Sequence, residues 1–383
     1  MDFRVFWKGR AGSVKASSHL RSRVAFAVLF LMGANLLIGN SYRAEQDTWI
    51  SVLLASVVLV LWTFVLARIS KLFPGKDVFS LLAMLPKWIG FPLISITTFY
   101  CFSQTVITLR VYSGFVHIVS LPNTTILILL VLISLTVWFF LLNDNEVLYR
   151  FSYITIIPII FIVLLLFVFL APMFRAQNLF PIFYNNTGDV LYCTAENFAF
   201  PFGNIFLLLG ISFCPNEPKK ERNVWILVAI LACLLTLIIV FQNLLLLGGK
   251  LSNALDFPYN FAASLVNVGD FFSRIEVFSS LFFFLSAIVR SAYLMKLTSR
   301  GVQRLVSVSQ KAVAFPLITL LCAYSAIAFE NTNSVFNFLQ VFPYIAFLVQ
   351  FGIPLVIWFV CERTARRKNE ERGELPKYTF RML

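Results

Sequence analysis

The sequence predicts an all-helical integral membrane protein. Hydrophobic residues make up 59% of the 383 residues and charged residues only 13%, whereas ordinary globular domains carry about 25% charged residues. The mean hydropathy is +0.84, so a soluble fold could not bury this much apolar surface. The apolar residues also gather in segments of about 20 residues, the length that crosses roughly 30 Å of hydrocarbon as a helix.

We expect about ten transmembrane helices, with boundary errors of about 2–4 residues. In chain order, spans 1 to 10 cover residues 24–42, 48–67, 88–109, 124–142, 151–171, 195–214, 224–247, 272–295, 312–329 and 338–361. They form one transmembrane domain, 24–361, between a basic N-terminal segment, 1–23, and a charged tail, 362–383. Basic residues before span 1 also fit a signal peptide, but without a small-x-small cleavage motif we interpret span 1 as a retained helix.

The distribution of basic residues predicts the orientation. Most of the 31 Lys and Arg residues lie before span 1, after spans 2, 4, 6 and 8, or after span 10. By the positive-inside rule this side faces the cytoplasm, so both termini are expected there. Membrane topology and attraction to anionic lipid also explain the net charge of +13 better than a nucleic-acid surface does.

Cysteine and histidine form no recognisable metal or catalytic motif. The six cysteines include no CxxC pair, and most lie in apolar segments, where cysteine behaves as a small hydrophobic residue. His19 and His117 are far apart in the sequence. With no nucleophile–base pair or metal-ligand set, we expect neither an enzyme nor a bound metal or cofactor.

Two predicted spans contain residues that interrupt helices. Span 6 contains Phe198-Ala-Phe-Pro-Phe-Gly-Asn204, and span 1 contains Gly33-Ala-Asn-Leu-Leu-Ile-Gly39. Proline removes a backbone donor and glycine loosens a helix, so main-chain groups are freed that lipid cannot satisfy. The freed N–H groups suit a carboxylate, and the freed carbonyls suit a cation.

The positions of these breaks predict the architecture. Spans 1 and 6 are five spans apart, so they enter the membrane from opposite sides. This pattern is typical of a five-plus-five inverted repeat with broken helices 1 and 6 and a ligand site near the midplane. The alternative is that Gly33 and Gly39 only allow close helix packing.

Polar residues on spans 3 and 8 are further candidates to line the ligand site. Those on span 3 recur at helical spacing and should face the bundle, either to bind a ligand or to form interhelical hydrogen bonds. They are Thr97, Tyr100, Gln104 and Thr108.

Span 8 contains Arg290, and an arginine at a helix centre costs about 2.5–3.5 kcal/mol on insertion scales. Residues expected on the same helix face are Glu276, Ser279, Ser286 and Tyr293. Arg290 is expected to hold a ligand carboxylate, pair with an acid or mark an ion path. The alternative is snorkelling toward the cytoplasmic end, near Lys296.

The candidate substrate-binding residues therefore come from spans 1, 3, 6 and 8. They are Gly33, Ala34, Asn35, Thr97, Tyr100, Gln104, Phe200, Gly203, Asn204, Ser286 and Arg290.

Short motifs in a fixed order carry a family resemblance from about Gly33 to Lys296. They are Gln46-Asp47-Thr-Trp49, Leu72-Phe-Pro-Gly-Lys76, Arg110, Leu121-Pro-Asn-Thr-Thr125, Phe200-Pro-Phe-Gly203 and Val268-Gly-Asp-Phe-Phe-Ser-Arg-Ile-Glu276. With them the chain resembles the B subunits of spore-germination nutrient receptors, the spore permease family of the amino acid–polyamine–organocation superfamily.

The resemblance implies a LeuT-like fold and a role in sensing nutrient germinants, often amino acids, in the inner membrane of a bacterial spore. The partners that it implies are a larger membrane A subunit and a C-type lipoprotein. A secondary transporter of amino acids or similar solutes is the alternative. Asn204 stands where family members often have an acid, and Arg290 where many have Lys, so the ligand is left open.

Overall fold

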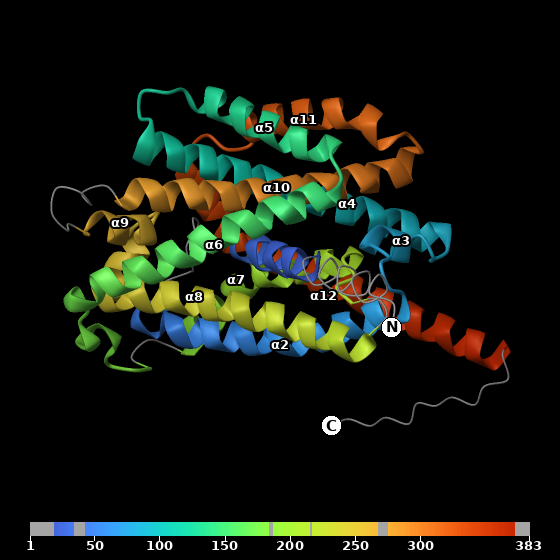
Figure 1. Ribbon diagram of the computed structural model, residues 1–383, viewed down its shortest axis with the longest axis horizontal. Coiled ribbons are helices and arrows are strands. Elements are labelled where there is room, and N and C mark those ends of the chain that lie inside the picture. The colour runs from blue at the N-terminus through green and yellow to red at the C-terminus, as the bar shows by residue number, and fades with distance from the viewer. Residues whose placement is uncertain (1–18, 34–42, 184–186, 215–216, 267–274, 372–383) are drawn as a thin grey trace, which may run out of the picture.

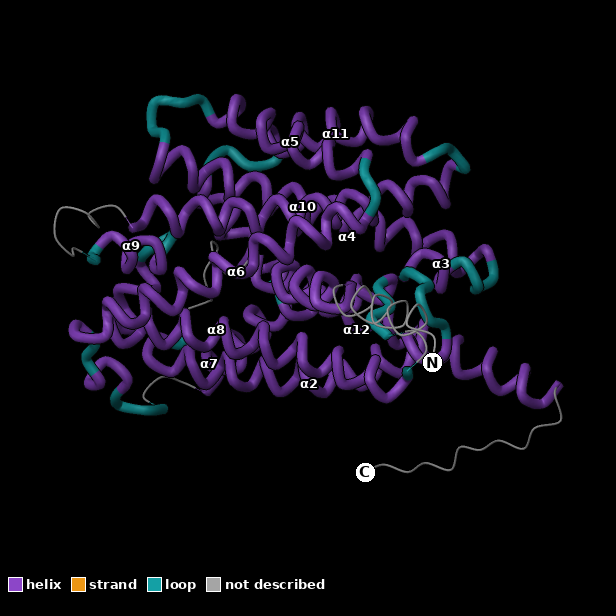
Figure 2. The backbone as a smooth tube through the Cα atoms, viewed as in Figure 1, coloured by secondary structure: helices purple, strands orange, loops and turns teal. Residues whose placement is uncertain are grey.

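The computed structural model describes residues 19–33, 43–183, 187–214, 217–266 and 275–371. All regular elements in these ranges are helices joined by short loops, as Figure 2 shows. Residues 19–33, called the N-terminal helix below, form the first one. The others are η1 Glu45–Asp47, α2 Thr48–Leu72, α3 Val78–Leu82, α4 Lys87–Phe115, η2 Val116–Ser120, α5 Ile126–Leu142, α6 Asn145–Leu170, η3 Ala171–Met173, η4 Ala176–Leu179, α7 Thr187–Ala199, η5 Phe202–Gly210, α8 Pro218–Ala254, α9 Pro258–Ser264, α10 Ile275–Val306, α11 Gln310–Ile327 and α12 Thr332–Glu371. The predicted all-helical class is confirmed.

Seven helices within the described ranges are long and apolar enough to cross a membrane. They correspond to predicted spans 2, 3, 5, 7, 8, 9 and 10. Span 4 corresponds to α5, an apolar helix of 17 residues. Span 1 is described only as far as Gly33, and span 6 is divided between α7 and η5.

Several helices continue beyond the predicted boundaries. Helix α8 runs over Pro218–Ala254 instead of 224–247, and α12 continues to Glu371 instead of 361. Hydropathy detects only the part of a helix that lies in hydrocarbon, while Lys, Arg and Glu are good helix formers that extend helices into water. The end of α12, drawn in red, projects beyond the other helices in Figure 1.

The helices pack side by side along the long axis of the molecule (Figure 1). Helices α5 and α11 lie together at one edge, α2 and α8 at the other, and α4 contacts α10 between them. The N-terminal helix, drawn in dark blue, lies in the middle of the bundle, and residues 25–32 are all at most 5% exposed. A helix that is apolar and covered on every side belongs to the interior. The described part of the first predicted broken span, up to Gly33, therefore lies at the centre of the fold.

The backbones of η1 and α8 approach each other closely at one end of the bundle. Gly248 in α8 has φ = +77°, a conformation that favours glycine, and it interrupts the helix. A Cβ atom on the next residue, Gly249, would lie 2.4 Å from the carbonyl carbon of Glu45. Only glycine therefore allows η1, at the start of α2, to pack on α8.

Candidate ligand site at the broken helices

The helix of predicted span 6 is broken at Phe200 and Pro201. Helix α7 ends at Ala199, and η5 begins at Phe202. Proline has no N–H to continue the helical hydrogen bonds, so the chain continues into η5, whose residues 202–209 are all buried. The second residue after Phe202 is Asn204, which is fully buried. The break predicted from the sequence is thus present, and it places an amide side chain in the interior.

The hydroxyl of Tyr100 joins three elements at this break. It donates to Asn204 Oδ1 of η5 at 2.7 Å and accepts from Gln104 Nε2 of α4 at 3.1 Å. It also accepts from Gln350 Nε2 of α12 at 2.8 Å. All four side chains are at most 4% exposed. The polar face predicted for span 3 therefore points into the bundle at Tyr100 and Gln104.

Gln350 is a member of this network that the sequence analysis missed. Its Nε2 also donates to the carbonyl of Ala199, the last residue of α7, at 2.6 Å. A Cβ atom on Gly203 would lie 1.9 Å from Gln350 Oε1, so glycine is needed there to admit the amide. A signal was available in the sequence, because Gln350 is a strongly polar residue inside an apolar span, and such residues tend to face protein rather than lipid.

Arg290 points into the bundle rather than toward its end. The residue is fully buried, and its Nη1 donates to the carbonyl of Phe30 at 2.9 Å. Its Nη2 donates to Gln104 Oε1 at 3.3 Å. The guanidinium carbon lies 5.2 Å and 4.9 Å from the ring centres of Phe30 and Phe200, distances at which cation–π attraction acts. The Arg290 side chain therefore does not snorkel toward the cytoplasmic end of its helix.

No carboxylate pairs with Arg290 among the residues that the structure describes. Within the described ranges, its charge is met by carbonyl oxygens and aromatic faces. Tyr293, one turn further along α10, donates to the carbonyl of Leu207 at 3.0 Å and so holds η5 against the same helix. The site combines one buried cation with neutral polar groups.

The other predicted site residues divide into two groups. Gly33 packs closely on α10, since a Cβ there would lie 2.9 Å from the carbonyl oxygen of Ser286; the close-packing alternative thus describes Gly33 well. The Ser286 hydroxyl donates to the carbonyl of Phe283 at 2.7 Å. Thr97 and Thr108 are buried, but their hydroxyls donate to carbonyls of their own helix at 2.6 Å and 2.7 Å and do not join the network. Ala34, Asn35 and Gly39 lie outside the described residues.

Three buried polar atoms at the break have no hydrogen-bond partner among the residues that the structure describes. They are Asn204 Nδ2, Arg290 Nε and Gln350 Oε1. An unpaired buried polar group costs about 1–3 kcal/mol, so most such groups in proteins are satisfied. Two of these atoms carry N–H donors and one is an acceptor, and they come from η5, α10 and α12. They would complement a small molecule that offers both acceptors and a donor.

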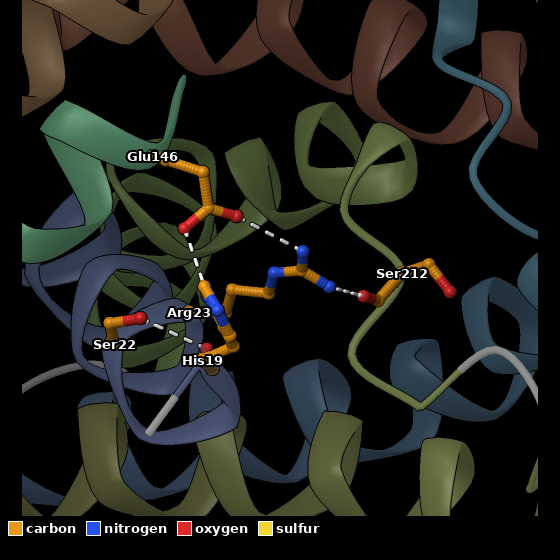
Figure 3. A network of polar contacts seen from close by, with 5 residues as sticks. All are labelled: His19, Ser22, Arg23, Glu146 and Ser212. Carbon is orange, nitrogen blue, oxygen red and sulfur yellow. Dashed lines mark hydrogen bonds and ion pairs between the residues drawn. The ribbon is translucent and has the colours of Figure 1, made fainter. Parts of the chain in front are cut away.

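A second polar network links the N-terminal helix to the end of η5 (Figure 3). Arg23 Nη1 donates to the carbonyl of Ser212, just beyond η5, at 2.6 Å. Its Nη2 donates to Glu146 Oε1 at 3.2 Å, and His19 Nδ1 lies 3.2 Å from Glu146 Oε2. Glu146 is in the first turn of α6, where the helix dipole favours an acid. The N-terminal helix and the segment just after η5 are thus held to each other.

The described residues contain no group of three or more His, Cys, Asp or Glu side chains that could hold a metal ion. What the arrangement offers is recognition: one buried guanidinium, amides, a hydroxyl and aromatic faces. None of these groups forms a nucleophile–base pair.

Comparison with known proteins decides the family. A family model described as spore germination protein (spore permease) matches residues 21–334. The chain belongs to the spore germination protein family. It is 22% identical over 325 residues to a protein named for spore germination, YfkT, of Bacillus subtilis (strain 168), which covers 84% of this chain and 89% of that protein. It is also 22% identical over 378 residues to spore germination protein KB of the same strain, covering 95% and 99%.

Family membership confirms the resemblance found in the sequence. Together with the long apolar helices, it identifies the chain as an integral membrane protein. The matched residues include Arg290 and the η5 break, whereas Gln350 lies beyond them. The contact between Gln350 and Gly203 therefore joins the matched part of the chain to a helix that is mostly outside it.

Proposed function

We propose that this chain is the nutrient-sensing membrane subunit of a spore germination receptor. It binds a small nutrient, such as an amino acid, between the N-terminal helix, α4, η5 and α10, and it performs no chemistry on that ligand. The observation that carries this proposal is Arg290, a fully buried cation that no described carboxylate neutralises. A ligand carboxylate near its unpaired Nε would supply the missing charge and hydrogen bond.

The orientation of the ligand follows from the neutral groups. Asn204 Nδ2 adds a second donor for a carboxylate, and Gln350 Oε1 offers an acceptor for an ammonium or hydroxyl group. An α-amino acid carries one charge of each sign at a short distance and fits this arrangement. The rings of Phe30 and Phe200 flank the guanidinium, so an apolar side chain of the ligand would find apolar walls nearby.

The proposed architecture is a LeuT-like five-plus-five inverted repeat of ten helices. Its support is that the two rings on Arg290 come from the two spans predicted to be broken: Phe30 lies in the described part of the first, and Phe200 lies at the break of the sixth. In this arrangement residues 1–23 and 362–383 are cytoplasmic segments on either side of the domain 24–361, in the inner membrane of a spore. Gly33, Ala34 and Asn35 line the ligand site together with the residues described above.

Signalling requires that the ligand bind one conformation more tightly than another. The network around Tyr100 connects the ligand site to α12, whose end projects from the bundle. We propose that this helix transmits the change to an A-type membrane subunit and a C-type lipoprotein. A secondary transporter would use the same site, and the experiment below separates the two.

The test is germination of spores that carry a deletion complemented with variants of this chain. Across a panel of amino acids and sugars, Arg290→Ala should raise the half-maximal nutrient concentration by at least about tenfold, which corresponds to 1.4 kcal/mol of lost binding. Membrane abundance should stay normal. Arg304→Ala is the matched control, since Arg304 is an exposed arginine on the same helix. An unchanged dose–response for Arg290→Ala would remove Arg290 from the site.

Liposomes that contain the purified chain alone provide the second arm. A receptor subunit should show no solute uptake driven by an ion gradient. Such uptake would favour the transporter.

A further inference from the structure

Very few acids occur on the elements that meet at the break. Residues 19–33, α4 and η5 contain no Asp or Glu, and neither do residues 34–42, which follow the N-terminal helix in the sequence. On α10 the only acid is Glu276. At 1.5 Å per residue it lies about 21 Å along the helix from Arg290, too far for an ion pair.

The acids of α12 and α7 interact with other groups. The first acid on α12 is Glu362, about 18 Å along the helix from Gln350, and it pairs with Arg68 at 2.7 Å. Glu196, in the last turn of α7, is half-buried. Its charge acts on Tyr192, where burial and, next, the Glu196 carboxylate raise the pKa of the hydroxyl.

The site at the break therefore carries the charge of Arg290 with no acid to balance it. The carbonyl of Phe30, the amide of Gln104 and the two rings beside the guanidinium stabilise the cation, but all of them are uncharged. No carboxylate pairs with it in the part of the chain that the structure describes. A buried charge is costly unless an opposite charge pairs with it.

We infer that this site selects a small carboxylate of net charge −1 over a zwitterion. The unpaired Gln350 Oε1 can accept from an ammonium or from a hydroxyl, so hydrogen bonding does not separate the two kinds of ligand, but net charge does. A net anion neutralises Arg290, whereas a zwitterion leaves the site positive and adds an ammonium that must be desolvated beside a like charge. Anion selectivity stands on these charges, and its use in nutrient sensing rests on the proposed function.

The experiment compares small molecules that match in shape and differ in charge. The purified full-length chain in detergent is unfolded by heat at pH 7 and constant ionic strength, with lactate or alanine and with glutamate or glutamine. In at least one pair the anion should raise Tm saturably, by at least about 2 °C more than its zwitterionic match. Lactate as that anion would place a hydroxyl at Gln350 Oε1, and glutamate alone would place an ammonium there.

Asn204→Asp tests the charge directly. It keeps the acceptor for the Tyr100 hydroxyl and adds a negative charge, so the advantage of the anion over its match should disappear. Asn337→Asp is the matched control, because Asn337 is exposed in the second turn of α12, and it should retain the advantage. Should Asn204→Asp fail to accumulate, Gln104→Glu replaces it and is judged by the same criterion, since position 104 contacts Arg290 Nη2 at 3.3 Å.

Two results would overturn the inference. One is a wild-type chain whose Tm responds to neither anion more than to its zwitterionic match. The other is an Asn204→Asp protein that unfolds cooperatively and retains the full advantage of the anion.

Failure of the proposed function has a different signature. The anion would then raise the Tm of the wild type but not that of Arg290→Ala, while spores that carry Arg290→Ala respond to nutrients as the wild type does. Conversely, a Tm rise with alanine that equals the rise with lactate and is lost in Arg290→Ala would agree with the proposed function and contradict selection by net charge.

Discussion

Gly203 and Gln350 meet so closely that a Cβ atom on the glycine would lie 1.9 Å from the glutamine Oε1. The same amide donates from Nε2 to the Tyr100 hydroxyl and to the carbonyl of Ala199. The contact therefore ties α12 to both sides of the break between α7 and η5. Any side chain at position 203 must displace the amide and its hydrogen bonds.

Gly203→Ala is predicted to lower the free energy of unfolding by about 1–3 kcal/mol, because it overpacks the break and leaves the partners of Gln350 unsatisfied. Chemical unfolding of the detergent-solubilised chain measures this. The matched control is Gly352→Ala on α12, where a Cβ would meet no atom within 4 Å. That control should not lower the free energy of unfolding, because alanine within a helix is favoured over glycine by about 0.5–1 kcal/mol.

A double-mutant cycle tests whether Gln350 is the cause. Gln350→Ala removes the amide that collides with the new Cβ, so Gly203→Ala should cost less in that background. The coupling energy should be about 0.5–3 kcal/mol. Additive effects of the two substitutions would contradict the contact as the source of the loss.

Tyr100→Phe is predicted to destabilise the chain by about 1–3 kcal/mol and to weaken the nutrient response. The substitution keeps the ring but removes a hydroxyl that serves Asn204, Gln104 and Gln350, so three buried groups lose a partner at once. Tyr324→Phe is the control, since that ring is 45% exposed. Unfolding midpoints and germination curves of the two variants provide the measurement. Equal effects would show that the hydrogen bonds of the Tyr100 hydroxyl do not matter more than those of an exposed tyrosine.

Features that depend on composition, or on the residues within a single helix, could be predicted from the sequence. Apolar windows predicted helices that the structure contains, and the Pro-Gly run at Phe200–Gly203 predicted the break. Helical spacing predicted that Tyr100 and Gln104 share an inward face. Their role in ligand binding stays a prediction.

Features that depend on packing between helices could not be predicted in the same way. Gln350 has no polar neighbour at helical spacing on α12, so its place in the network follows only from how that helix lies across Gly203. Thr97 and Thr108 have the correct spacing, but a threonine hydroxyl can bond a carbonyl of its own helix instead of a ligand. In the structure both threonine hydroxyls donate to a carbonyl of their own helix.

Arg23→Lys is predicted to loosen the junction between the N-terminal helix and η5 more than Glu146→Gln does. The guanidinium reaches both the Ser212 carbonyl and Glu146, as Figure 3 shows, and one ammonium lacks this forked geometry. Glu146 is 38% exposed in its side chain, so its ion pair alone is worth less than about 1 kcal/mol.

Hydrogen exchange around Phe213 measures this loosening. Exchange should be faster in Arg23→Lys than in the wild type and little changed in Glu146→Gln. Lys220→Ala, which removes an exposed pair with Glu217, serves as the control. Faster exchange in Glu146→Gln than in Arg23→Lys would show that the carboxylate, and not the carbonyl contact, holds the junction.

Helix α8 provides a direct test of the predicted orientation. Lys220 and Lys250 are exposed near its two ends. From Lys220 to Leu247, just before the interruption at Gly248, a rise of 1.5 Å per residue gives about 40 Å, which exceeds the roughly 30 Å of hydrocarbon. The two residues should therefore lie on opposite sides of the membrane, with Lys220 on the cytoplasmic side that carries most of the basic residues.

Single-cysteine variants at these positions report the orientation through a membrane-impermeant maleimide. The six native cysteines are buried or half-buried and are replaced first. In intact vegetative cells Lys250→Cys should react and Lys220→Cys should not, and both should react once the cells are permeabilised. Because the two positions lie at opposite ends of one apolar span, the reverse pattern would invert the proposed topology and place both termini outside. Labelling of both positions in intact cells would mean that α8 does not cross the membrane.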